Sequence, residues 1–124
     1  MSNSIKSVKD LKVYQLVYEL ALEIFEISKD FPKEEKYSLT DQSRRSSRSA
    51  AIKIREGFAK RHYENIFIRH LVDALGSADE TRGWIDFAFE SKYINKEKHI
   101  YFNDQYDQLN AMLTKLIENW KNFK

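Results

Sequence analysis

Seven basic side chains lie close together in one part of the sequence and are the strongest candidates for chemistry. Between Thr40 and His62 they stand against two acids, Asp41 and Glu56, so this segment has a net charge of +5 in a chain of net charge +2. Guanidinium and ammonium groups bind phosphate oxygens, and a local excess of positive charge attracts polyanions. The seven residues are Arg44, Arg45, Arg48, Lys53, Arg55, Lys60 and Arg61.

The same segment has the spacing of a helix. Small and apolar residues recur at steps of three and four, at Ser47, Ala50, Ala51, Ile54 and Phe58, and predict one inward face. At about 100° per residue, one edge of that face carries Arg44, Arg48 and Arg55, and the far side carries Arg45, Lys53 and Lys60. The pattern predicts contact with RNA or DNA phosphates, without preference for sequence because no standard base-reading motif is present.

A structural role for the arginine pair is the alternative. Arg44 or Arg45 would then form an ion pair with Glu56 or Glu80 inside the fold, and the other basic groups would only be solvated. Under that interpretation the protein is a structural scaffold or an adaptor for a protein partner.

Catalysis and metal binding find little support in the sequence. The chain has no cysteine, its three histidines (His62, His70 and His99) are scattered, and no glutamate is followed by histidine three residues later, as di-iron helical bundles require. Glu56 and Glu80 have no histidine or cysteine nearby and are interpreted as ion-pair partners. We therefore expect a protein that is not an enzyme and holds neither a metal nor a cofactor.

The elements that position these residues are predicted to be helices, because 124 residues include one proline and three glycines. We expect a flexible segment over 1–7 and a single domain over 8–124, an all-α up-down four-helix bundle. Its helices are predicted near 8–28, from a cap at Ser38 or Thr40 to 60, at 63–91, and from a cap at Asn95 onward. In the last helix, heptad positions hold Phe102, Tyr106, Leu109, Leu113, Leu116, Trp120 and Phe123.

The first predicted helix is apolar over most of its circumference, which is more than a surface helix of a monomer needs. We expect a second subunit to cover it at Leu16, Leu20, Ile24 and Ile27, with Trp84 and Phe87 as further contacts. Gly76 and Gly83 lie seven residues apart on one helix face, and a close helix crossing would offset their low helix propensity.

The sequence also bears on location. No run approaches the roughly 20 apolar residues of a transmembrane helix, and the first residues lack the apolar region of a signal peptide. We therefore expect no membrane association and a cytoplasmic protein.

Several short motifs, in order and at near-constant spacing, give the chain a resemblance to a known family. They are the run from Phe31 to Gln42, Arg44-Arg45, Glu56-Gly57, and the run from Ala74 to Glu80. In these the chain resembles the four-helix-bundle proteins encoded in 23S rRNA intervening sequences, over about residues 11–94. The resemblance implies a ring-like homopentamer without established enzymatic activity. A more distant similarity, to accessory proteins of diversity-generating retroelements, implies nucleic acid and a reverse transcriptase as partners.

The chain departs from that family within the basic helix. Where the family usually has Ser-Ile-x-x-Asn-Ile-Ala-Glu-Gly, this sequence has Lys53 in place of the asparagine and Arg55 in place of the alanine. Both departures add positive charge to the same helix. The expected function is therefore an oligomeric binding module in which the assembly multiplies a basic face.

Overall fold

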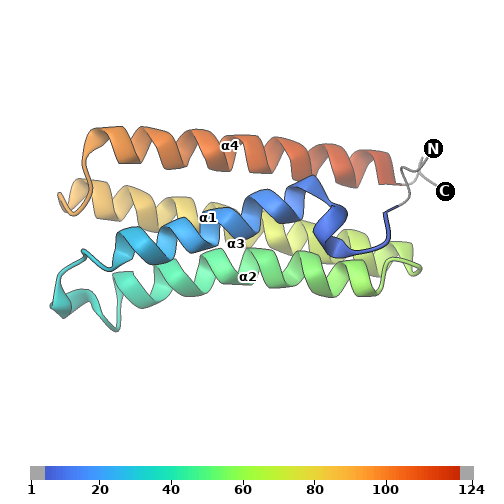
Figure 1. Cartoon of the computed structure of the whole chain (residues 1–124), viewed down its shortest axis with the longest axis horizontal. Coiled ribbons are helices and arrows are strands. Elements are labelled where there is room, and N and C mark those ends of the chain that lie inside the picture. Colours follow the sequence, from blue (N-terminus) through green and yellow to red (C-terminus); the bar gives the residue numbers. More distant parts are fainter. Residues whose placement is uncertain (1–4, 121–124) are drawn as a thin grey trace.

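Four long helices form the fold of the computed structural model, which describes residues 5–120. Within those residues there are no strands, and two short 3-10 turns, η1 and η2, precede the first two long helices. Figure 1 shows the four long helices side by side, with successive helices running in opposite directions. This arrangement confirms the predicted all-α four-helix class; Phe123 lies outside the described residues. The elements are η1 (Val8–Asp10), α1 (Lys12–Ser28), η2 (Lys33–Glu35), α2 (Leu39–Ala59), α3 (Glu64–Glu90) and α4 (Lys96–Asn119).

The first helix begins later than the sequence predicts. Leu11 has an extended backbone (φ −80°, ψ 122°), which separates η1 from α1. Asp10 explains the separate turn, because its carboxylate accepts hydrogen bonds from the backbone N–H groups of Lys6 and Ser7, each at 2.9 Å. Ser7 in turn caps η1, so residues 6 and 7 of the segment predicted to be flexible are held to the fold.

The start of α2 depends on Glu35 and not on the predicted serine cap. The Ser38 hydroxyl donates to Glu35 Oε1 at 2.6 Å, and the backbone N–H of Leu39 donates to the same oxygen at 3.3 Å. The Tyr93 hydroxyl donates to Glu35 Oε2 at 2.8 Å, so one carboxylate joins the loop before α2 to the turn before α4. The hydrogen bonds from Ser38 and Tyr93 lower the pKa of Glu35. The predicted cap of α4 is confirmed, because Asn95 Oδ1 accepts from the backbone N–H of Lys98 at 2.8 Å.

The core corrects the prediction that α1 is covered by another subunit. Leu20 and Ile24 are fully buried inside their own bundle and are not available to a second copy. Leu16 and Ile27 are half-buried and pack against the same core. The physical reason is that α1 contacts α2 on one side, α4 on another and η1 at its start, so most of its circumference is covered within the chain. Its exposed large apolar side chains are Tyr18 and Leu22.

Helices α2 and α3 form the most extensive pairing in the bundle. Small side chains of α2 permit it, since Ser43, Ser47 and Ala50 are fully buried. The two helices approach closely at Gly57, where an added Cβ atom would lie 2.7 Å from the Cβ atom of His70. The close crossing predicted at Gly76 and Gly83 is not made in this chain, because a Cβ atom at either position would meet nothing within 4 Å.

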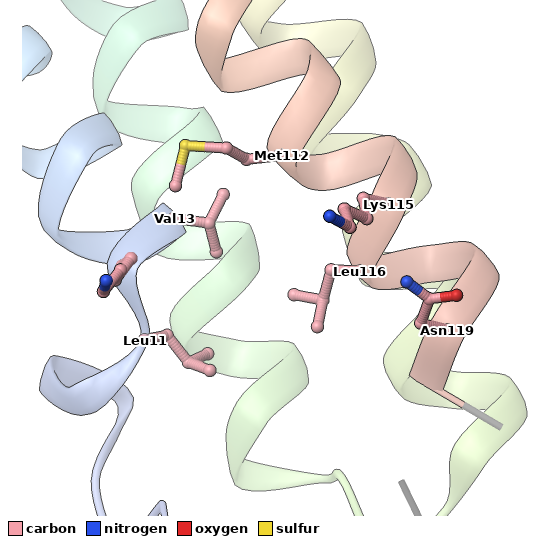
Figure 2. A pocket seen from close by; sticks show the side chains of 7 residues that line it. Leu11, Val13, Met112, Lys115, Leu116 and Asn119 are labelled. Atoms are coloured by element: carbon pink, nitrogen blue, oxygen red, sulfur yellow. The ribbon is translucent and has the colours of Figure 1, made fainter. Parts of the chain in front are cut away.

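Helices α1 and α4 pack less closely than the other neighbouring pairs. An apolar groove of about 250 Å³ opens between the start of α1 and the end of α4. Figure 2 shows Leu11 and Val13 on one side of this groove and Met112 and Leu116 on the other. None of the described helices is both long and apolar enough to span a lipid bilayer.

Candidate nucleic-acid interface

Three of the basic residues predicted to bind phosphate form a row along the edge of α2 that faces α1. We call Arg44, Arg48 and Arg55 the arginine row. Arg44 is the most firmly held, because its Nε donates a hydrogen bond of 2.7 Å to the buried hydroxyl of Ser28. Its guanidinium carbon lies 4.5 Å from the ring centroid of Phe25, within the range of a cation–π contact.

The other two arginines of the row also lie on aromatic rings of α1. The guanidinium carbon of Arg48 is 5.4 Å from the centroid of Phe25, so Arg44 and Arg48 share one ring. Arg55 lies 6.0 Å from the centroid of Tyr14 and donates from Nη1 to the Tyr14 hydroxyl oxygen at 3.2 Å. Contact with a ring face orders an arginine while its in-plane N–H groups stay able to donate to a phosphate.

The alternative ion pair of the arginines is not formed. Among residues 5–120, neither Arg44 nor Arg45 lies within 4.0 Å of a carboxylate oxygen of Glu56 or Glu80. Glu80 accepts a hydrogen bond from Trp84 Nε1 at 3.1 Å instead. Arg44 turns away from α3 because Phe25 and Ser28 of α1 hold it on the opposite edge of α2.

None of the seven basic residues has a carboxylate within 4.0 Å among the described residues. No ion pair within the described part of the chain therefore neutralises these seven side chains. Two guanidinium groups on one ring repel each other, and an anion between them would relieve that repulsion.

The remaining four basic residues do not join the arginine row. Arg45 is exposed, while Lys53 is half-buried on the side of α2 away from α1. Lys60 follows the last residue of α2, and the guanidinium carbon of Arg61 lies 4.0 Å from the ring centroid of Phe58. The structure thus divides the predicted site into an ordered row facing α1 and separate basic groups elsewhere.

The aromatic partners of the arginine row were not predicted as part of the site. The sequence did contain a signal for them: Tyr14 and Phe25 lie eleven residues apart, and so do Arg44 and Arg55. Because α1 and α2 are antiparallel neighbours, this equal separation lets Arg44 meet Phe25 while Arg55 meets Tyr14.

Two hollows open beside the arginine row. The first, of about 420 Å³, is lined by apolar and aromatic groups of α1 and α2 that include Tyr18, Leu22 and Ile52, with Arg48 at its margin. The second, of about 480 Å³, is lined by Lys9, Tyr14, Gln15, Tyr18 and Arg55. Both have volumes within the roughly 300–1,000 Å³ of ligand sites. Tyr18 borders both hollows and is 51% exposed.

The opposite side of α1 is acidic. A groove between α1 and α4 is lined by Glu19, Glu23, Glu26 and Asp30, among others. The Tyr101 hydroxyl donates to Glu23 Oε1 at 2.6 Å, and this hydrogen bond raises the pKa of Tyr101 to about 12. One helix therefore separates a positive face, shared with α2, from a negative groove, shared with α4.

The histidines give no catalytic arrangement in the described part of the chain. His99 lies 2.8 Å from Asp86 Oδ1 and stacks on Phe89 with a centroid distance of 4.3 Å, which joins α3 to α4. His70 packs against Gly57 at the crossing of α2 and α3. Within residues 5–120, no group of three histidine, cysteine, aspartate or glutamate side chains is placed to hold a metal ion.

The two aromatic residues predicted on α3 as an oligomer contact lie together near its end. Phe87 is 61% exposed, and its ring centroid is 5.9 Å from that of the half-buried Trp84. A groove of about 410 Å³ beside them is also lined by Tyr37 and Gln42.

The fold and the site define a class: a small four-helix bundle with an ordered basic edge on its second helix. Comparison with protein families then shows which family within that class the chain belongs to. The profile of the 23S rRNA-intervening sequence protein family matches residues 9–115, and the chain belongs to that family.

Solved structures give a second comparison. The chain is similar to a protein of unknown function from the S23 ribosomal protein family of Bacteroides thetaiotaomicron VPI-5482. The two share 28% sequence identity with a TM-score of 0.77, over 86% of this chain and 95% of the other. Comparison with curated proteins finds no match.

Proposed function

We propose that the protein is a non-catalytic module that binds nucleic acid through the arginine row of α2. The observation that carries this proposal is the absence of a carboxylate partner, within the described residues, for three arginines already ordered on aromatic rings. Phosphates would supply the missing negative charge, and ordered side chains lose less entropy when they bind.

The contacts available to the row favour backbone recognition. Arg44 and Arg55 each use one donor inside the chain, and all three guanidinium groups keep further N–H donors. Phosphate oxygens are alike along every nucleic acid, so binding to them tolerates different sequences. The family to which the chain belongs is named for an intervening sequence of 23S rRNA, which makes RNA the first ligand to test.

The test is a binding titration with labelled RNA and DNA at low and at moderate salt. The double variant Arg48→Glu/Arg55→Glu reverses two charges of the row and spares Arg44, which is hydrogen bonded to Ser28. The matched control Lys96→Glu/Lys115→Glu makes the same change in net charge on exposed positions of α4. We expect tight binding at low salt for the wild type and the control, and strongly weakened binding for the α2 variant.

If wild-type protein binds neither RNA nor DNA, or if both double variants bind equally well, the nucleic-acid proposal fails. A scaffold or a protein-partner adaptor, such as an accessory subunit of a reverse transcriptase, would then be the better description. Co-purification with a candidate partner protein would test it.

We also propose that copies of the chain associate, as the ring-like pentamer of the resemblance implies, through the exposed end of α3. Phe87 and Trp84 support this proposal, because an exposed aromatic ring beside a second, half-buried one is typical of subunit contacts. Light scattering should give a mass several times that of the 14.8 kDa chain, and Phe87→Glu should reduce it. A monomer at micromolar concentration would refute self-association but leave the arginine row as a site in each chain.

A further inference from the structure

The surface beside the arginine row contains more than phosphate-binding groups. The two hollows share the rings of Tyr14 and Tyr18, whose centroids are 5.8 Å apart at an angle of 38°. Tyr14 is buried, whereas half of Tyr18 is exposed between the hollows. A ring that lies open beside unpaired arginines is not needed for binding to phosphate alone.

A double helix could not use this ring. In a duplex the flat faces of the bases are stacked on one another, so the protein meets phosphates, sugars and groove edges. In a single strand the base faces are free, and they stack on aromatic side chains whatever the sequence. The combination of an exposed tyrosine with flanking arginines therefore fits a single strand better than a duplex.

The groups around the second hollow include polar atoms that are free to form further hydrogen bonds. The Tyr14 hydroxyl oxygen accepts from Arg55, which leaves its own hydrogen free to donate. Gln15 donates from Nε2 to the Lys9 carbonyl oxygen at 2.7 Å, and no other described residue forms a hydrogen bond with its Oε1 atom. The hollow thus offers one free donor and one free acceptor, which match the 2′-hydroxyl of RNA.

We propose that this surface binds single-stranded RNA, with one unstacked base on Tyr18, flanking phosphates on Arg48 and Arg55, and a ribose near Tyr14 and Gln15. The inference rests on the proposed function, since the arginine row supplies most of the attraction. It adds a preference for one form of nucleic acid, which the charges alone do not give. Leu22 and Ile52 form the apolar wall of the first hollow, against which the other face of the base packs.

The experiment compares three labelled ligands of equal length at one salt concentration: single-stranded RNA, single-stranded DNA of the same sequence, and duplex RNA. Fluorescence anisotropy gives the affinity of the wild type, of Tyr18→Ala and of Tyr14→Phe for each ligand. Tyr37→Ala is the matched control, because Tyr37 is 85% exposed and lies in the turn before α2. Circular dichroism verifies that each variant is folded.

We expect wild-type protein to bind single-stranded RNA most tightly. Tyr18→Ala should bind single strands about tenfold more weakly, because one stacked base is lost, and should bind the duplex as the wild type does. Tyr14→Phe should weaken binding to RNA more than binding to DNA, since it removes the donor to the 2′-hydroxyl. Tyr37→Ala should bind all three ligands as the wild type does.

The outcomes separate this inference from the function on which it rests. Equal affinity for duplex and single strand, with no effect of Tyr18→Ala, would overturn the single-strand proposal while the arginine row still bound nucleic acid. Equal affinity for single-stranded RNA and DNA would overturn the assignment to RNA. If none of the three ligands binds, either here or in the titration at low salt, the proposed function itself fails, and this surface is better explained as a contact for another protein.

Discussion

The crossing of α2 and α3 at Gly57 predicts that one substitution has opposite effects at two helical glycines. In a helix interior, replacing glycine by alanine usually stabilises a protein by about 0.5–1 kcal/mol. Gly76→Ala should follow this rule, since a Cβ atom there meets nothing within 4 Å. At Gly57 the new Cβ atom would lie 2.7 Å from the Cβ atom of His70.

The expected size of the effect at Gly57 follows from that distance. Carbon atoms pack best at about 3.5–4.0 Å, so the helices would have to separate by about 1 Å. The His70 Cβ atom is fixed to the backbone of α3 and cannot rotate away. Overpacking of this kind costs about 1–3 kcal/mol, which exceeds the gain in helix propensity of about 1 kcal/mol. We therefore expect Gly57→Ala to be destabilising by about 1 kcal/mol and the two variants to differ by about 2 kcal/mol.

Urea denaturation followed by far-UV circular dichroism measures this difference. With a urea dependence of about 2 kcal/mol per M, the midpoints of Gly57→Ala and Gly76→Ala should differ by about 1 M, with wild type between them. If Gly57→Ala raised the midpoint as much as Gly76→Ala does, the two helices would not approach as closely as the structure shows.

Three further predictions concern hydrogen bonds elsewhere in the bundle. Glu23→Gln should lower the pKa of Tyr101 from about 12 toward 10, as a spectrophotometric tyrosine titration would show. Because the pKa of Tyr101 is higher in the folded state, the stability that this pair contributes is complete below pH 10 and is lost as the pH rises to about 12. Unfolding measured over the same pH range should show this loss. Thr81→Val removes the buried donor of a 2.8 Å hydrogen bond to Ser46 and should lower the free energy of unfolding by about 1 kcal/mol in urea denaturation; an unchanged midpoint would contradict this. Asn95→Ala removes the cap of α4 and should cost about 1 kcal/mol in the same assay, whereas no loss would mean that the cap does not stabilise the helix.

Much of the fold follows from the period of the apolar residues. Phe102, Tyr106, Leu109 and Leu113 of α4 are buried as their spacing predicts, and so is the small-residue face of α2. Helix ends were less predictable, because they depend on distant partners. Glu35, for example, holds the start of α2 with help from Tyr93, 58 residues further along the chain.

The prediction about α1 was wrong in an informative way. An apolar circumference shows that a helix is covered on several sides, but it does not show whether the cover comes from the same chain. Leu20 and Ile24 are covered by their own bundle because α1 lies between α2 and α4. Of the six residues predicted to contact a second subunit, Phe87 on α3 is the one that the chain itself leaves exposed.

The sequence predicted which basic residues make up the candidate site, but not that they separate into an ordered row and isolated groups. Charge and spacing identified the basic residues, and the edge shared by Arg44, Arg48 and Arg55 was predicted correctly. The sequence did not show that Phe25 and Tyr14 would order that edge, or that Glu80 would bind Trp84 and not an arginine. Such choices depend on how two helices rotate against each other, which the pattern within one helix does not fix.

The salt dependence of RNA binding tests the central proposal most directly. For single-stranded RNA, each phosphate contact contributes about 0.7 to the slope of log affinity against log salt. Three arginines in the row predict a slope of about −2 or steeper for wild-type protein. For Arg48→Glu/Arg55→Glu the slope should be shallower than about −1. Binding that does not change with salt, or a slope that the double variant leaves as it was, would contradict recognition of phosphate by this row.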